Sequence, residues 1–222
     1  MGTLIELTAA DGHKLAAWKA MPAGKPKGGL VIIQEIFGMT EQMKRCTERF
    51  AAAGYVAILP AMFDRKEREA QLGYGEFQRG GKLAMSIPDE QILADVEAAR
   101  LEVAAAGKTA ITGYCWGGTV AYLAACQLEF ACAVSHYGSG IGRLASRMSP
   151  KIPVLYHFGG KDAFIPPATI DQIRKADPTG VFHIYAGADH GFACDDRESH
   201  HPAATALAEQ RTLEFLDRYA GT

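Results

Sequence analysis

A cysteine lies in the glycine-rich turn Gly113-Tyr114-Cys115-Trp116-Gly117-Gly118. Apolar residues at 109–112 and 119–127 flank this turn and predict a strand before it and a helix after it. Such a strand-to-helix turn is the context of a nucleophile elbow, with cysteine in place of the usual serine. Free N–H groups and the dipole at the start of the helix favour a thiolate and an oxyanion. Cys115 is therefore the candidate nucleophile and the N–H of Trp116 a candidate oxyanion donor, although such turns also bind phosphate.

An acid and a histidine follow the cysteine in the order that α/β-hydrolases use. Asp162 ends the segment Phe158–Asp162 directly after one apolar run, and His190 follows the next apolar run. A neutral imidazole that is hydrogen-bonded to a thiol can take its proton, and a carboxylate on the other ring nitrogen fixes the tautomer. The sequence thus predicts a triad of Cys115, His190 and Asp162. Asp189 is the rival acid, but the side chain of a sequence neighbour usually points away from the ring.

The segment Gln34-Glu35-Ile36-Phe37-Gly38 follows an apolar run at residues 30–33. In hydrolases of this type the loop after that strand supplies the second oxyanion donor, which we assign to the N–H of Ile36. A carboxylate at Glu35, close to the expected site, is costly to bury unless it is paired. Glu35 is thus either a functional charge or a salt-bridged one, and the residues alone leave both readings open.

Alternating strands and helices must position these groups. Asp11-Gly12, between two apolar stretches, predicts an antiparallel N-terminal hairpin with a two-residue turn. The expected strands span 29–33, 55–59, 109–112, 131–137, 153–158 and 181–185, and the expected helices span 40–53, 88–106, 119–127 and 203–219. This order predicts an α/β-hydrolase fold, a single domain over residues 1–222 whose doubly wound, mostly parallel sheet is flanked by helices. The polar, irregular segment 63–87 is expected to cover the site as a lid.

The composition excludes several classes of function. The chain has 23 basic and 25 acidic residues and a formal charge of -2, which does not fit the basic surface of a nucleic-acid-binding protein. No apolar stretch of about 18 residues predicts a membrane span, and no secretory signal is visible. The odd count of five cysteines then indicates reduced thiols in the cytoplasm. No metal-ligand spacing or dinucleotide fingerprint is present, so neither a metal nor a cofactor is expected.

The chain resembles the dienelactone hydrolase family over nearly its whole length. The resemblance rests on the four segments Gln34–Gly38, Gly113–Gly118, Gly159–Asp162 and Gly187–Phe192. It implies the triad of Cys115, His190 and Asp162, and it gives Glu35 the task of helping to deprotonate the nucleophile when substrate arrives. It also implies a monomer that hydrolyses an enol-lactone such as dienelactone to maleylacetate.

Members of this family hold the carboxylate of their substrate with arginines, and here the sequence departs from the pattern. Four residues after the histidine, where the family often has an arginine, this chain has Cys194. A cysteine cannot replace the bidentate fork of an arginine. The remaining candidates for substrate binding are Arg79, Lys82, Tyr137 and Arg197.

The expected function is a cysteine-dependent hydrolase of enol-lactones or esters, of the carboxymethylenebutenolidase kind. Its partner is then a small-molecule substrate rather than a nucleic acid or a membrane. The alternative is a carboxylesterase or thioesterase of the same fold whose substrate lacks the carboxylate. A third reading is a hydrolase-fold binding protein without catalysis, but binding alone does not require a nucleophile, an acid and a histidine in this order.

Overall fold

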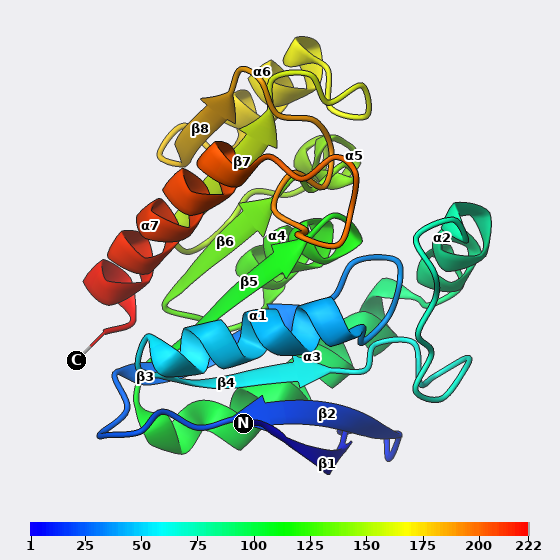
Figure 1. Cartoon of the computed structure of the whole chain (residues 1–222), viewed down its shortest axis with the longest axis vertical. Helices are drawn as coiled ribbons and strands as arrows, with labels where there is room; N and C mark the ends of the chain where they lie inside the picture. The colour runs from blue at the N-terminus through cyan, green and yellow to red at the C-terminus, as the bar shows by residue number, and fades with distance from the viewer. Residues whose placement is uncertain (222) are drawn as a thin grey trace.

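One twisted sheet of eight strands runs through the molecule in the order β1-β2-β4-β3-β5-β6-β7-β8 (Figure 1). The chain is represented by a computed structural model that describes residues 1–221. The strands are β1 (Thr3–Thr8), β2 (Lys14–Ala20), β3 (Gly28–Ile33), β4 (Tyr55–Pro60), β5 (Thr109–Tyr114), β6 (Cys132–His136), β7 (Val154–Gly159) and β8 (Val181–Tyr185). The pairings of β1 with β2 and of β2 with β4 are antiparallel, and all the other pairings are parallel.

Helices cover both faces of the sheet. They are α1 (Glu41–Ala52), α2 (Phe77–Met85), α3 (Asp89–Val103) with a 3-10 turn at Ala104–Ala106, α4 (Trp116–Gln127), α5 (Ile141–Ala145), α6 (Pro167–Ala176) and α7 (Pro202–Tyr219). In Figure 1, α1 and α7 lie in front of the sheet, whereas α3 and α4 lie behind it. This two-sided cover confirms the predicted α/β-hydrolase fold with its N-terminal antiparallel hairpin.

The central strands form the core because they are mostly apolar and lie between two layers of helices. Every residue of β3, β4, β5, β6 and β7 is buried, as expected for parallel strands with helices on both faces. Since these strands run in one direction, the loops at their carboxyl ends meet at a single edge of the sheet, where ligands bind in folds of this type. None of the helices within residues 1–221 is long and apolar enough to span a membrane.

Three local expectations differ from the structure. The hairpin turn has three residues rather than two, because Ala9 N–H donates to His13 O at 2.8 Å and leaves residues 10–12 as the loop. The helix after the elbow begins at Trp116, three residues earlier than its apolar run. The segment 63–87, expected to be irregular, contains α2, which stands out from the body of the molecule in Figure 1.

Candidate active site

Cys115 occupies a strained turn between β5 and α4. Its φ of 56° and ψ of -119° lie in a region that few residues other than glycine adopt. The turn closes tightly, because a Cβ on Gly113 would lie 2.0 Å from the carbonyl oxygen of Gly117. A Cβ on Gly117 would in turn lie 2.4 Å from the carbonyl oxygen of Ile33. The glycines of the motif therefore allow the backbone contacts that hold the sulfur at the edge of the sheet.

The three predicted triad residues meet at this edge. The Nε2 atom of His190 lies 3.1 Å from Cys115 Sγ, and its Nδ1 atom lies 2.8 Å from Asp162 Oδ2. The other oxygen of Asp162 accepts a hydrogen bond of 2.9 Å from the N–H of Phe164, which fixes the carboxylate. All three side chains are buried. A continuous chain of hydrogen bonds thus runs from the sulfur to the carboxylate.

The rival acid Asp189 lies elsewhere. Its side chain is exposed and accepts a hydrogen bond of 2.6 Å from the backbone N–H of His190. The imidazole is therefore oriented by Asp162 and not by its sequence neighbour. The expectation that the neighbouring aspartate points away from the ring agrees with this geometry.

The imidazole of His190 holds its proton strongly. Burial disfavours the charged ring, but the hydrogen bonds to Asp162 and Cys115 outweigh it and raise the pKa of His190 to about 10. A base with a raised pKa between a thiol and a carboxylate favours an imidazolium next to a thiolate. The arrangement can therefore present a charged sulfur nucleophile at neutral pH.

Two residues that line the cavity have backbone N–H groups without a hydrogen-bond acceptor in residues 1–221. The N–H groups of Ile36 and Trp116 donate no hydrogen bond within the described part of the chain. Trp116 opens α4, where the first N–H groups have no partner within the helix. Both residues line the same cavity as Cys115 and His190. Both N–H groups are therefore free to bind an oxyanion at this edge of the sheet.

Glu35 is buried and pairs with Arg197. The distance from Arg197 Nη1 to Glu35 Oε1 is 3.5 Å, and the carboxylate side chain is only 3% exposed. Burial raises the pKa of Glu35, against the opposing influence of Arg197, His190 and Tyr137. Glu35 is thus salt-bridged, and its place beside the triad is equally compatible with a functional charge. No hydrogen bond joins Glu35 to Cys115 within residues 1–221, and the sulfur contacts the histidine instead.

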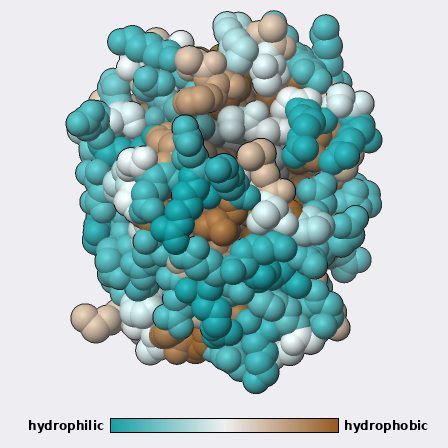
Figure 2. Space-filling view, turned by 90° about the vertical axis from the view of Figure 1, so that its right-hand side faces the viewer, coloured by the Kyte–Doolittle hydropathy of each residue, from teal (hydrophilic) through white to brown (hydrophobic). Residues whose placement is uncertain are grey.

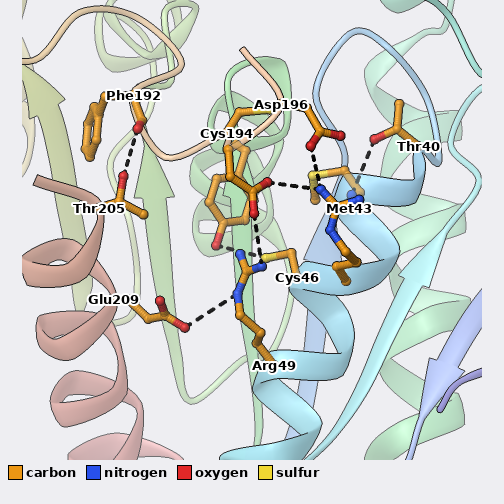
Figure 3. A network of polar contacts seen from close by, with 12 residues as sticks. Thr40, Met43, Cys46, Arg49, Phe192, Cys194, Asp196, Thr205 and Glu209 are labelled. Carbon is orange, nitrogen blue, oxygen red and sulfur yellow. Dashed lines mark hydrogen bonds and ion pairs between the residues drawn. The ribbon is translucent and has the colours of Figure 1, made fainter. Parts of the chain in front are cut away.

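Ion pairs fasten the loop that follows His190 to two helices (Figure 3). Arg45 of α1 contacts Asp196 at 2.6 Å and Asp195 at 3.2 Å. Arg49, one turn further along α1, lies between Asp195 and Glu209 of α7 at 3.8 and 3.7 Å. The loop that carries Arg197 is therefore held from the face of the sheet that α1 and α7 cover.

A cavity of about 710 Å³ opens over the sulfur. Its wall comes from α2, the start of α3, α4, α5 and the loops of Ile36, Phe164 and His190. Most of the lining side chains are apolar. Within residues 1–221 no group of His, Cys, Asp and Glu side chains is arranged to hold a metal ion.

None of the four predicted substrate-binding residues lines the cavity, and two of them, Arg79 and Lys82, lie on the exposed side of α2. Arg79 is exposed on α2 and pairs with Glu67 and Glu76, so its charge is already compensated away from the cavity. Lys82 is exposed on the same helix, whose cavity face is formed by other residues. Neither basic side chain reaches the cavity wall, because the helix turns its small and apolar residues inward.

Tyr137 and Arg197 do lie close to the triad, but beneath the cavity rather than in its wall. Tyr137 is fully buried, and its ring meets the edge of the His190 ring with centroids 5.2 Å apart. Arg197 lies over the rings of Phe37 and Phe77, each 5.6 Å from its guanidinium carbon. Arg197, seven residues after the histidine, therefore reaches the site through its contact with Glu35.

Comparison with known proteins agrees with this geometry. The model of the dienelactone hydrolase family matches residues 15–220. The chain belongs to the dienelactone hydrolase family. Carboxymethylenebutenolidases of Pseudomonas putida and Pseudomonas knackmussii are each 32% identical to it, over 96% of this chain and 94% of theirs. The chain is accordingly a hydrolase.

Solved structures show the same architecture. A protein of Klebsiella pneumoniae assigned as a dienelactone hydrolase superposes with a TM-score of 0.83 at 29% identity, over 99% of this chain and 100% of that one. A dienelactone hydrolase-like promiscuous phosphotriesterase from metagenomic libraries reaches a TM-score of 0.77 at 18% identity, over 99% of each chain. At that identity the second likeness shows the fold alone.

Arg143 lines the cavity but was not predicted from the sequence. This residue of α5 belongs to no motif and follows no apolar period. The helix α5 has only five residues and was not expected either. Only the packing of α5 beside the elbow brings this guanidinium to the site, so no local signal in the sequence reveals it.

Proposed function

We propose that the protein is a cysteine-dependent hydrolase of enol-lactones or esters, in which Cys115 is the nucleophile, His190 the base and Asp162 the orienting acid. The unbroken chain of hydrogen bonds from Cys115 through His190 to Asp162, at the wall of a large cavity, carries this proposal. Nucleophile, base and orienting group stand within hydrogen-bond reach of one another, which is the geometric requirement for such a triad.

The proposed reaction begins with the thiolate of Cys115 adding to the carbonyl carbon of the substrate. The N–H groups of Ile36 and Trp116 hold the oxyanion that forms. The C–O bond then breaks, the leaving oxygen takes the proton of His190, and an acyl-enzyme remains. An enolate leaves easily, so a lactone of this type needs little help from the acid. Water next gives a proton to His190 and attacks the acyl carbon, and the carbon–sulfur bond breaks as the product leaves.

Glu35 enters the proposal as a second acid–base group. The family resemblance gives it the task of helping to deprotonate the nucleophile when substrate arrives. For that, the carboxylate exchanges its contact with Arg197 for one with Cys115. The long distance of 3.5 Å in the Glu35–Arg197 pair supports a carboxylate that is not firmly fixed, and its raised pKa suits a group that accepts a proton.

The names of the relatives support an enol-lactone as substrate. Two features favour the alternative, a carboxylesterase or thioesterase whose substrate lacks the carboxylate that the arginines of the family hold. Cys194 stands in place of the family arginine, and its thiol contacts the hydroxyl of Tyr74 at 3.4 Å. The cavity wall is also mostly apolar and admits neither Arg79 nor Lys82.

The assignment of the nucleophile is tested with two cysteine variants. We expect Cys115→Ala to abolish hydrolysis of p-nitrophenyl acetate and of dienelactone-type lactones, whereas Cys194→Ala keeps most of it. Cys115→Ser is expected to be much weaker than the parent, because a hydroxyl is far harder to ionise than a thiol. Iodoacetamide should inactivate the parent and the Cys194→Ala variant alike.

The same panel separates the readings of function. Turnover of lactones with negligible turnover of esters favours the enol-lactone reading, and the reverse favours the esterase. Loss of activity in Cys194→Ala but not in Cys115→Ala contradicts the proposed nucleophile. No turnover of either class by folded protein contradicts catalysis and leaves a binding protein.

A further inference from the structure

Arg143 is an uncompensated charge in the cavity wall. The titratable residues of the lining are Asp89, Cys115, Arg143 and His190. Asp89 is paired with Arg147 at 3.1 Å, so its charge is offset. The guanidinium of Arg143 makes no ion pair or hydrogen bond with any residue in the range 1–221. The cavity therefore carries one free cation in addition to the triad.

The backbone that carries Arg143 is well fixed. The N–H of Gly140 donates to Thr119 Oγ1 of α4 at 3.0 Å, and the amide of Gln172 in α6 donates to the carbonyl of Gly142 at 2.8 Å. The neighbouring side chains of Ile141 and Leu144 are buried. Because α5 is held between α4 and α6, the guanidinium starts from a constant position beside the cavity and only its own rotamers vary.

The rest of the cavity suits an apolar body. At its rim stand Phe77, Met85 and Phe164, which are 40%, 82% and 62% exposed and also line the cavity. Figure 2 looks onto the face that carries α2 and shows hydrophobic residues recessed between hydrophilic ones. A volume of about 710 Å³ lies within the range of about 300–1,000 Å³ typical of pockets for ligands of drug size. A small monocyclic lactone leaves most of this space unfilled.

We propose that Arg143 binds an anionic group on the part of the substrate distant from the reacting carbonyl, so that the preferred substrates are esters with an extended apolar body and a terminal carboxylate. This inference rests on the proposed function, because Cys115 must react with the ester end. It differs from the binding of a carboxylate by Arg197 or Arg79, since Arg143 belongs to α5 and lines the cavity, whereas Arg79 and Arg197 do not.

Arg143 is exposed, which limits how much an ion pair with it can contribute to substrate binding. An ion pair with an exposed side chain is weak, whereas a bidentate pair of arginine and carboxylate in a partly enclosed cavity is stronger. We therefore expect a contribution of about tenfold in kcat/KM, mostly through KM, that shrinks at high salt.

The test compares two series of p-nitrophenyl esters with the same number of carbons. One series consists of neutral alkanoates and the other of mono-esters of dicarboxylic acids, which differ only in the terminal carboxylate. Arg143→Ala is expected to lower kcat/KM about tenfold for the carboxylated series at one preferred chain length and to leave the neutral series within twofold. Arg143→Glu should lower the carboxylated series further, and Arg143→Lys should restore part of it.

Arg218→Ala serves as the matched control, because Arg218 is an exposed arginine of α7 that does not line the cavity. It removes the same charge and is expected to change neither series. Equal changes in both series with Arg143→Ala, or an equal loss with Arg218→Ala, overturn the inference while the hydrolase stands. Turnover of dienelactone-type lactones without turnover of either ester series also overturns the inference, whereas no turnover of lactones or esters contradicts the proposed function itself.

Discussion

Cys115 Sγ and His190 Nε2 lie 3.1 Å apart, and the other nitrogen of the ring is hydrogen-bonded to Asp162. Because the pKa of His190 is raised to about 10, the ring keeps its proton through neutral pH, and a cation beside the sulfur favours a thiolate. The ring loses this proton only when the pH rises through about 10. An ordinary thiol behaves differently, since its ionised fraction rises about tenfold per pH unit below its pKa of about 8.5.

Alkylation of Cys115 measures this directly. We expect the second-order rate constant of iodoacetamide with the parent to be nearly flat between about pH 6 and pH 9. In Asp162→Asn the ring loses the carboxylate that stabilises its charge, so the rate at pH 7 should fall about tenfold or more and rise with pH. The measurement is the rate of inactivation across that range, with mass spectrometry to confirm modification of Cys115.

Asp189→Asn is the control for this experiment. The Asp189 carboxylate contacts a backbone N–H and not the ring, so its loss should leave the flat profile of the parent. A steep profile in the parent, or the same steep profile in both aspartate variants, would contradict an ion pair set by Asp162.

At the level of residues, the sequence was sufficient where the chemistry is tied to a motif. Cys115, Asp162 and His190 each follow a strand of the parallel part of the sheet, which brings the carboxyl ends of these strands together. Arg143 and the Glu35–Arg197 pair depend on how loops pack in space. The sequence also did not reveal that Arg79 lies outside the cavity, because this depends on the side of α2 that faces the solvent.

Among the elements, α2 has the most direct influence on the site. A Cβ on Gly80 would lie 2.1 Å from the carbonyl oxygen of Ile36, so the helix rests directly on the loop whose N–H is the proposed oxyanion donor. The same helix contributes Phe77 and Met85 to the rim of the cavity. A shift of α2 therefore moves the donor and the rim together.

Gly80→Ala tests this contact. The added methyl group must push α2 or the Ile36 loop aside, and a misplaced donor should lower kcat/KM for ester hydrolysis by about ten- to a hundredfold. Alkylation of Cys115 by iodoacetamide forms no oxyanion and should change much less. Alanine also favours the helix more than glycine does, so the loss is not expected to come from unfolding.

Gly75→Ala is the matched control, since a Cβ there meets nothing within 4 Å just before the same helix. It should keep the activity of the parent. Parental ester hydrolysis in Gly80→Ala would show that the close approach of α2 to Ile36 has no bearing on the reaction.

The long elements were predictable, and the short ones near the cavity were not. Helices α1 and α7 show clear caps and periodicity, and Thr40 caps α1 by accepting a hydrogen bond from Met43. The segment of α2 contains the pair Gly80-Gly81, which weakens any helical signal. The sequence does carry a signal for α6, because Pro167 begins the helix and its buried Ile170 and Ile173 lie one turn apart.

On the scale of the whole molecule, Arg65 joins three distant segments. Arg65 lies in the segment between β4 and α2. Its side chain contacts both oxygens of Asp95 in α3 at 2.8 Å and Asp11 of the hairpin at 2.7 Å. Arg65 and Asp95 are nearly inaccessible, with side chains 7% and 1% exposed. Arg65 therefore ties the segment 63–87 to the N-terminal hairpin and to α3, and its pair with Asp95 is buried.

Arg65→Met leaves the buried carboxylate of Asp95 without a partner, which costs about 3–5 kcal/mol. For a chain of this length we expect the unfolding temperature to drop by about 10 °C. Burial already raises the pKa of Asp95 against the effect of Arg65, so the variant should bind a proton there more readily. A carboxyl with a raised pKa in the folded state stabilises that state at low pH, so the deficit should be smaller at pH 5 than at pH 8.

Calorimetry at the two pH values checks both expectations. Arg100→Ala is the control, because Arg100 pairs with Glu97 only along the surface of α3 and such pairs contribute about 0.5 kcal/mol or less. An equal loss of stability in the two variants, or a deficit in Arg65→Met that grows in acid, would contradict the role given to the buried pair.

The triad stands on loops that follow β5, β7 and β8, whereas much of the cavity wall comes from α2, α5 and the start of α3. Mutation can therefore alter what the cavity admits while the reacting atoms stay in place. Lineages that share this architecture can then diverge in substrate through a few changes in two short helices.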